Sequence, residues 1–155
     1  MARWENNSET RPMALIALAK EHDPASLDVF REALVHLDPA VRFAALEALS
    51  VWGHPDKALP LLDAASQRDA DPLLRVYAAG GMARLGAPEG LARLRTFLQD
   101  ASWLVRCMAA RYLGEYGTAD DYRLLVSKIG GETGNDFVVA EYCIAALKLF
   151  PKTAT

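Results

Sequence analysis

Three histidines and two cysteines are the side chains of this chain best able to do chemistry. His22, His36 and His54 are widely separated in the sequence, and no carboxylate accompanies them at a repeated spacing. A metal site needs several such ligands held close together. We therefore expect no metal and no cofactor at these histidines.

The two cysteines, Cys107 and Cys143, are expected to serve packing. A nucleophilic cysteine needs a neighbouring base and a lowered pKa, and no histidine lies near Cys107 in the sequence. The helical phase places Cys107 on the exposed side of its helix and Cys143 on the buried side. A helical domain of 155 residues has enough core without disulfides, which favours a reducing compartment and a cytoplasmic protein.

One segment is rich in glycine, Gly130-Gly131-Glu132-Thr133-Gly134. It lacks the lysine of a phosphate-binding loop, and it is expected to follow a helix and not a strand. We interpret it as a turn. No catalytic residue is predicted, so the sequence favours a protein without catalytic activity but does not decide the question.

Composition narrows the class of protein further. The 155 residues are 52% hydrophobic and 24% charged, which is typical of one globular domain. The net charge of -3 offers no basic excess for a nucleic acid or an acidic membrane surface, so neither is expected as a partner. No apolar run approaches the length of a membrane span, and the polar start from Met1 to Pro12 shows no secretory signal.

A repeat organises the elements that must position these residues. Val-Arg or Leu-Arg pairs occur at 41–42, 74–75 and 105–106, and a glycine follows each arginine at one constant distance, at 53, 86 and 117. The three arginines stand at nearly equal intervals along the chain. Continuing these intervals backward reaches Arg11, and continuing them forward reaches Ala140. The repeat predicts four full units and a leading half unit.

We call the place of the repeated arginine, which is Ala140 in the last unit, the register position. Each unit is expected to contain a helix that begins at a capping residue four positions before it. The capping residues are Asn7, Asp38, Asp71, Ser102 and Asp136. Prolines follow two of them, and Gly53, Gly86 and Gly117 suit the left-handed residue that closes a helix. We call these helices the B helices. Asp38 can pair with Arg42, and Asp71 with Arg75, within the helix or across to the next unit.

Apolar residues recur in the B helices at a helical period and predict their buried side. This stripe comprises Val41, Ala45, Ala48, Leu49 and Trp52, then Leu74, Ala78, Gly81, Met82 and Leu85, then Val105, Ala109, Tyr112, Leu113 and Tyr116, and last Val139, Cys143, Ala146, Leu147 and Phe150. The leading half unit offers Ala14, Ala17 and Leu18 at the same places. A second helix, the A helix, is expected before each full B helix, and three A helices open at Pro24, Pro55 and Pro88.

The segment from Asp38 to Leu49, Asp-Pro-Ala-Val-Arg-Phe-Ala-Ala-Leu-Glu-Ala-Leu, resembles a HEAT repeat of the short bacterial, phycobilisome-lyase-like kind. The resemblance covers roughly Arg11 to Phe150, which we interpret as one domain between a polar N-terminal segment, 1–10, and a tail, 151–155. It implies an all-α fold. This would be a right-handed α-α superhelix of about four full repeats plus a leading half repeat, with the B helices on its concave side.

HEAT-like repeats serve lyases, hydroxylases, DNA-repair proteins and adaptors, so the resemblance implies architecture more than function. HEAT-type hydroxylases carry His-Glu dipeptides that bind iron, and this sequence has none. DNA-repair members need a basic groove, whereas the outward B-helix positions here include Glu47, Glu115 and Glu141. We predict a scaffold or adaptor for a protein partner. A bilin lyase or lyase subunit acting on a phycobiliprotein, and a fragment of a larger HEAT-repeat regulatory protein, are the alternatives.

The side of the B helices opposite the predicted core is unusually small and apolar. We predict that a partner helix or peptide binds there, at Phe43, Glu47, Val76, Gly80, Ala83, Cys107, Arg111 and Gly114. The alternative is that adjacent B helices pack closely and need these small residues.

A second surface is predicted at the open end of the last B helix. There Val138, Tyr142 and Leu149 would face the place of a missing fifth unit. A homodimer through the C-terminal helix, another protein, or further repeats of a longer chain could cover this end.

Overall fold

The computed structural model describes residues 10–154, with side chains from Arg11 onward. Asn7, the first predicted cap, lies outside the described residues. The helices are α1 (Thr10–Lys20), η1 (Pro24–Ser26), α2 (Leu27–Leu34), α3 (Pro39–Val51), α4 (Pro55–Arg68), α5 (Pro72–Arg84), α6 (Pro88–Phe97), α7 (Trp103–Tyr116), α8 (Ala119–Ile129), α9 (Asp136–Leu149) and η2 (Phe150–Ala154), where η marks a 3-10 helix. No strand occurs in this described range.

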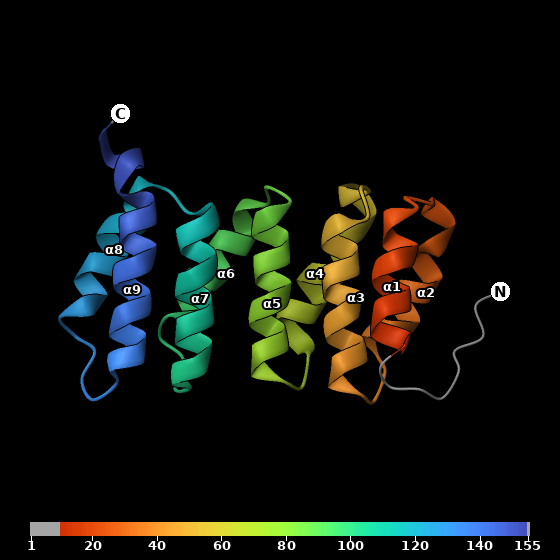
Figure 1. Cartoon of the computed structure of the whole chain (residues 1–155), viewed down its shortest axis with the longest axis horizontal. Helices are drawn as coiled ribbons and strands as arrows, with labels where there is room; N and C mark the ends of the chain where they lie inside the picture. The colour runs from red at the N-terminus through yellow and green to blue at the C-terminus, as the bar shows by residue number, and fades with distance from the viewer. Residues whose placement is uncertain (1–9, 155) are drawn as a thin grey trace.

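The α-helices form two layers (Figure 1). The B helices α1, α3, α5, α7 and α9 stand side by side in one row, and the A helices α2, α4, α6 and α8 lie behind it. Each B helix contacts the next B helix, and each A helix packs against the B helix that follows it. The predicted all-α stack, with four helix pairs after a leading half unit, is therefore confirmed.

Local capping chemistry sets the ends of α3 and α5. The side chains of Asp38 and Asp71 each accept a hydrogen bond at 2.9 Å from the backbone N–H two residues later. Gly53 and Gly86 follow these helices with φ angles of 85° and 84°, a left-handed conformation that glycine adopts without strain. The predicted caps and stops of these two helices are confirmed.

The end of α7 differs from this prediction. Gly117 has a φ of -74°, so it is not left-handed. A Cβ at this position would collide with the carbonyl oxygen of Leu113. The turn needs glycine here because the backbone folds back on itself, and not because of the sign of φ.

The last unit is one residue out of the predicted register. Asn135, and not Asp136, caps α9, and its side-chain oxygen accepts hydrogen bonds from the N–H groups of Phe137 and Val138 at 3.1 and 3.3 Å. The interval from the previous unit is therefore one residue shorter than predicted. This unit lacks an arginine at the register position, and both Asn135 and Asp136 can cap a helix. The sequence therefore offered no way to choose between them.

The buried side of α9 shifts by the same residue. Its buried side chains are Val138, Tyr142, Ala145, Ala146 and Leu149. Leu147 and Phe150, predicted to be buried, are 72% and 57% exposed.

The prediction for α1 is also partly wrong. Ala14 and Ala17 are exposed, whereas Leu15 and Ala19 are buried. Among the described elements, α1 has a B-helix neighbour on one flank only, α3. The residues that face α3 are therefore buried, and those on the opposite flank are not.

Arginines at the register position tie one unit to the next. Arg42 Nε donates to Asp69 Oδ2 at 3.0 Å, and Arg106 Nη2 donates to Glu132 Oε1 at 2.8 Å. Each arginine also donates at 2.8 Å to a backbone carbonyl of the turn before its own helix. The two carboxylates belong to the next unit, but the partner of Arg42 is Asp69 and not the predicted Asp38, which caps α3.

Arg75 interrupts this series. Its side chain makes no hydrogen bond within the described residues, and its Nε is buried without an acceptor. The predicted pair with Asp71 does not form, because Asp71 caps α5 instead.

Candidate interaction surface on the B helices

Three of the eight residues predicted to bind a partner lie on the exposed side of the B-helix row. Phe43 on α3 is 36% exposed, and the Arg111 side chain on α7 is 55% exposed. Glu47 on α3 is half-buried. We call this surface the B-helix face and define it by Phe43, Glu47, Tyr77, Met108, Arg111, Tyr112 and Glu115.

The other five predicted residues do not lie on a surface. Val76, Gly80, Ala83, Cys107 and Gly114 are all buried. The prediction that a partner binds at these five residues is wrong, and the alternative, close packing of adjacent B helices, is correct.

Two glycines show why these positions are small. A Cβ added at Gly80 would lie 2.5 Å from the ring of Tyr112 on the next B helix. A Cβ added at Gly114 would lie 2.9 Å from the Cα of Ala145 on α9. Both distances are shorter than carbon atoms tolerate, so glycine permits the helix spacing of the stack.

Aromatic rings cross the B-helix face from one unit to the next. Phe43 and Tyr77 have ring centroids 4.8 Å apart, and Tyr77 and Tyr112 have centroids 6.2 Å apart, both with an edge-to-face geometry. Tyr116 continues the row, stacked on Tyr112 at 6.5 Å. Each ring is partly exposed. This aromatic row joins α3, α5 and α7.

A hollow of about 340 Å³ adjoins the row between α7 and α9. Two ion pairs bridge it, from Arg111 to Glu141 and from Lys148 to Glu115. Tyr112, at its edge, has a raised pKa because its phenol is largely buried and because Glu47 lies nearby. The hollow therefore offers paired charges and the neutral hydroxyl of Tyr112 beside apolar rings.

The two cysteines differ from the prediction, which placed Cys107 on the exposed side and Cys143 on the buried side of its helix. Cys107 is buried, and burial together with the charge of Glu141 raises the pKa of its thiol. Cys143 is half-buried. A raised pKa disfavours the thiolate, so Cys107 is suited to packing and not to nucleophilic attack.

The residues predicted to form the end surface are also misplaced. Val138, Tyr142 and Leu149 are at most 1% exposed and pack in the core of the last units. This error follows from the one-residue register shift of α9, which rotates the whole helix by about 100° relative to the prediction.

The histidines do not converge. His22 Nδ1 contacts the Trp52 carbonyl at 2.8 Å, and His54 Nε2 contacts the His22 carbonyl at 2.6 Å, so both tie inter-helix turns together. Within residues 10–154, no group of three or more His, Cys, Asp or Glu side chains could hold a metal ion. The helices in this range include none with the length and apolar character of a membrane span.

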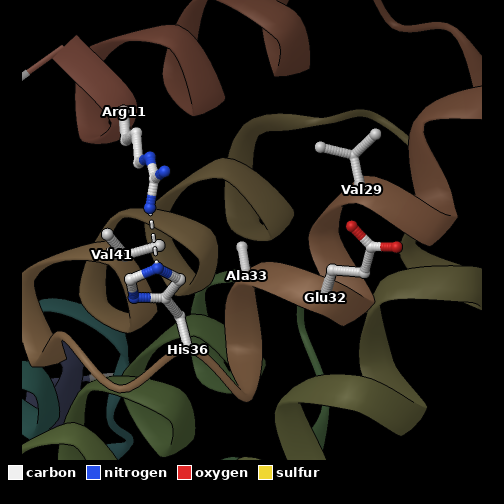
Figure 2. Close-up of a pocket in the computed structure, with 6 residues that line it drawn as sticks. All are labelled: Arg11, Val29, Glu32, Ala33, His36 and Val41. Carbon is white, nitrogen blue, oxygen red and sulfur yellow. Dashed lines mark hydrogen bonds between the residues drawn. The ribbon is translucent and has the colours of Figure 1, made fainter. Parts of the chain in front are cut away.

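His36 lies in a small pocket at the first unit (Figure 2). Arg11 Nη1 is 2.9 Å from its Nε2, and the N–H of Asp38 is 3.0 Å from its Nδ1. A neutral imidazole can accept at only one nitrogen, so only one of these two contacts can be a hydrogen bond at a time. Glu32 lines the pocket away from this contact (Figure 2).

Tyr77 and Met108 were not among the predicted site residues, and Tyr112 and Tyr116 were predicted to lie in the core. The signal that could have found the aromatic row is the recurrence of Phe43, Tyr77 and Tyr112 at nearly equal intervals. The intervals between these aromatic residues are longer than those between Arg42, Arg75 and Arg106. The rings therefore lie on different flanks of successive B helices.

The two layers of repeated helix pairs define the class of protein as an α-solenoid. The profile of one family, described as HEAT repeats, matches residues 2–71 and 58–148. The chain belongs to the HEAT repeat family. A comparison with curated proteins finds no match. HEAT repeats generally serve as scaffolds for protein interactions.

Proposed function

We propose that this protein is an interaction scaffold whose B-helix face binds a helical or extended segment of a partner protein. The observation that carries the proposal is the aromatic row, in which Phe43, Tyr77 and Tyr112 are partly exposed and touch one another across three units. Aromatic side chains dominate the energetics of protein interfaces because they bury large areas at a low cost in conformational entropy.

The charges beside the row support a segment with both apolar and polar side chains. Arg111 and Glu115 are exposed by 55% and 48% even though each is ion-paired to α9. A partner segment can therefore place apolar anchors on the rings and polar groups along α7 and α9. Such rim charges contribute more to specificity than to affinity.

Partner capture tests this proposal. The native chain, Phe43→Ala, Tyr77→Ala and the control Val126→Ala would be used as baits in extracts of the native host. Val126 on α8 is 45% exposed and belongs to the other helix layer. The captured protein would then be purified and its dissociation constant measured for each bait.

We expect each aromatic substitution to weaken binding at least tenfold, and the control to leave it unchanged. Far-UV circular dichroism and thermal melting would verify that all variants fold. A partner bound equally well by Phe43→Ala and Tyr77→Ala would refute a site on the B-helix face.

Four finer statements remain proposals. The interpretations as a bilin lyase and as a fragment of a larger regulatory protein rest on family resemblance alone. A cytoplasmic location is supported by the two free thiols, which suit a reducing compartment. Self-association through the C-terminal helix is supported by the exposed side chains of α9.

A further inference from the structure

The carboxylate of Glu47 on α3 lies beside the aromatic row without a counter-ion. Glu47 is half-buried, and no ion pair or hydrogen bond within residues 10–154 involves its carboxylate. Phe43 stands four residues before it, which places both side chains on the same side of α3. The charge of Glu47 also contributes to the raised pKa of Tyr112, two B helices further along the stack. Glu47 therefore belongs to the surroundings of both rings.

Gly80 explains how a carboxylate on α3 comes close to a ring on α7. Glu47 and Gly80 each follow the arginine of their unit by five residues, so they stand at equivalent positions of α3 and α5, which are neighbours in the row (Figure 1). Gly80 has no side chain, and the ring of Tyr112 occupies the space over it. No side chain at this position of α5 therefore separates Glu47 from the Tyr112 ring.

The cations near the aromatic row do not pair with Glu47. Arg111 donates to Glu141, and Lys148 donates to Glu115, so both cations are held by the pairing of α7 with α9. Arg84 on α5 also affects the pKa of Tyr112, but it is exposed and makes no ion pair in the described part of the chain. Of the two carboxylates on the B-helix face, only Glu47 lacks a direct cationic contact within this range.

We propose that Glu47 and the rings of Tyr77 and Tyr112 form a binding site for an arginine side chain, and that the partner segment supplies this arginine. The inference rests on the proposed function and names the partner chemistry at that same site. A segment that covers the aromatic row also removes water from Glu47, which costs free energy unless the segment brings a cation or hydrogen-bond donors. The faces of the tyrosine rings are negative and attract a cation as well.

Arginine suits these groups better than other side chains do. Its planar guanidinium can stack on an aromatic ring and donate two parallel hydrogen bonds to one carboxylate. Its apolar stem can pack on a ring such as that of Phe43. An acidic side chain would be repelled by Glu47, and a purely apolar one would leave that carboxylate unpaired.

Titration of the isotope-labelled full chain, followed by nuclear magnetic resonance, tests this binding directly. The probes are the capped pentapeptide Ala-Ala-Arg-Ala-Ala and the same peptide with citrulline, which has the shape of arginine without its charge. We expect the arginine probe to shift the amide signals of Glu47, Tyr77 and Tyr112 and to bind at least tenfold more tightly than the citrulline probe. Equal binding of the two probes, or no binding of the arginine probe, would overturn the proposal.

Three variants separate the role of Glu47 from the general acidity of the chain. Glu47→Gln should weaken binding of the arginine probe at least tenfold, to the level of the citrulline probe. Glu89→Gln removes the same charge from an exposed position on α6, in the other helix layer, and should leave the affinity unchanged. Arg84→Gln should leave it unchanged or strengthen it, because this change removes a competing cation.

Circular dichroism would establish that the three variants keep their helicity. Equal losses of affinity in Glu47→Gln and Glu89→Gln would overturn the assignment to Glu47. A loss in Arg84→Gln would also overturn it, because the probe would then depend on a cation of this chain.

The scaffold proposal and this inference can fail separately. A captured partner that loses affinity in Phe43→Ala and Tyr77→Ala, but not in Glu47→Gln, would support the scaffold and refute the arginine. A partner bound equally well by all three variants would refute the scaffold site, and binding of the arginine probe that depends on Glu47 would still support the arginine site. Loss of partner affinity in all three variants would support both.

Discussion

The ring of Tyr112 on α7 lies directly against the backbone of Gly80 on α5. An added Cβ at Gly80 would be 2.5 Å from the Cε1 and Cζ atoms of that ring. Glycine inside a helix costs about 1 kcal/mol relative to alanine, so its presence needs a reason. The reason is that this contact sets the spacing of two B helices and supports the ring of Tyr112 in the aromatic row.

Substitution of the close-packed glycines should destabilise the fold. Gly80→Ala gains about 1 kcal/mol of helix propensity but forces the Tyr112 ring to move, for an expected net loss of about 1–2 kcal/mol. Gly114→Ala should cost more, because its new methyl group meets the backbone of Ala145, which cannot move without α9. Urea denaturation followed by circular dichroism would measure both losses.

Gly130 provides the matched control for these substitutions. It has a φ of -72°, and no atom lies within 4 Å of the position of an added Cβ. Gly130→Ala should therefore be neutral or stabilising by up to about 1 kcal/mol. Equal losses at Gly130 and Gly80 would show that contact with Tyr112 is not the cause.

The buried carboxylate of Asp121 should make stability depend on pH. Asp121 is 1% exposed and accepts hydrogen bonds from Arg95 at 2.6 and 3.0 Å and from the Thr118 N–H at 2.9 Å. Burial raises the pKa of Asp121, but the bonds from Arg95 and Thr118 outweigh this effect, so the pKa is lowered. A lowered pKa in the folded state stabilises the protein above the ordinary carboxyl pKa of about 4.

This contribution should be lost as the pH falls below about 4 toward the folded-state pKa of Asp121. Asp121→Asn should lose about 1–3 kcal/mol at pH 7, a range reduced by the partial exposure of Arg95, and the gap to the native chain should narrow in acid. Asp120→Asn is the control, because Asp120 is 88% exposed and its pair with Arg123 lies in solvent. An unchanged gap between pH 7 and pH 2.5 would contradict the assignment to Asp121.

Loss of the Arg42 bridge should weaken the stack. The Arg42 and Asp69 side chains are 15% and 5% exposed, and Arg42 also bonds to two carbonyls of the preceding turn. Arg42→Ala leaves these acceptors unpaired and should cost about 2–4 kcal/mol, or roughly 4–16 °C in Tm. Arg75→Ala removes an arginine without such bonds and should cost less than about 1 kcal/mol. Differential scanning calorimetry of the two variants would contradict this explanation if their Tm values fell equally.

Replacement of His36 by aspartate should stabilise the first unit. His36 stands where Asp69 stands in the next unit, and Asp69 accepts from both Arg42 and the N–H of Asp71. An aspartate can accept from both neighbouring donors at once, whereas a neutral imidazole cannot. We expect His36→Asp to gain about 1 kcal/mol, and His36→Asn, which lacks the charge, to gain less. If chemical denaturation shows a lower free energy of unfolding for His36→Asp than for the native chain, the imidazole has another role.

The sequence alone was enough to predict the repeat, the helix pairs and the caps of α3 and α5. These features depend on interactions within a few residues, such as an aspartate accepting the N–H two positions later. In α9 no arginine stands at the register position. Asn135 and Asp136 were equally suitable as caps, and the register was therefore misplaced by one residue.

Only the tertiary structure decided which residues face solvent. A helix in a stack is contacted on several flanks, and periodicity identifies an apolar flank without showing what lies opposite it. Gly80 and Gly114 look the same in the sequence whether they line a groove or receive a neighbouring helix. The distances to Tyr112 and Ala145 settle the matter, because they depend on how closely helices distant in the sequence approach one another.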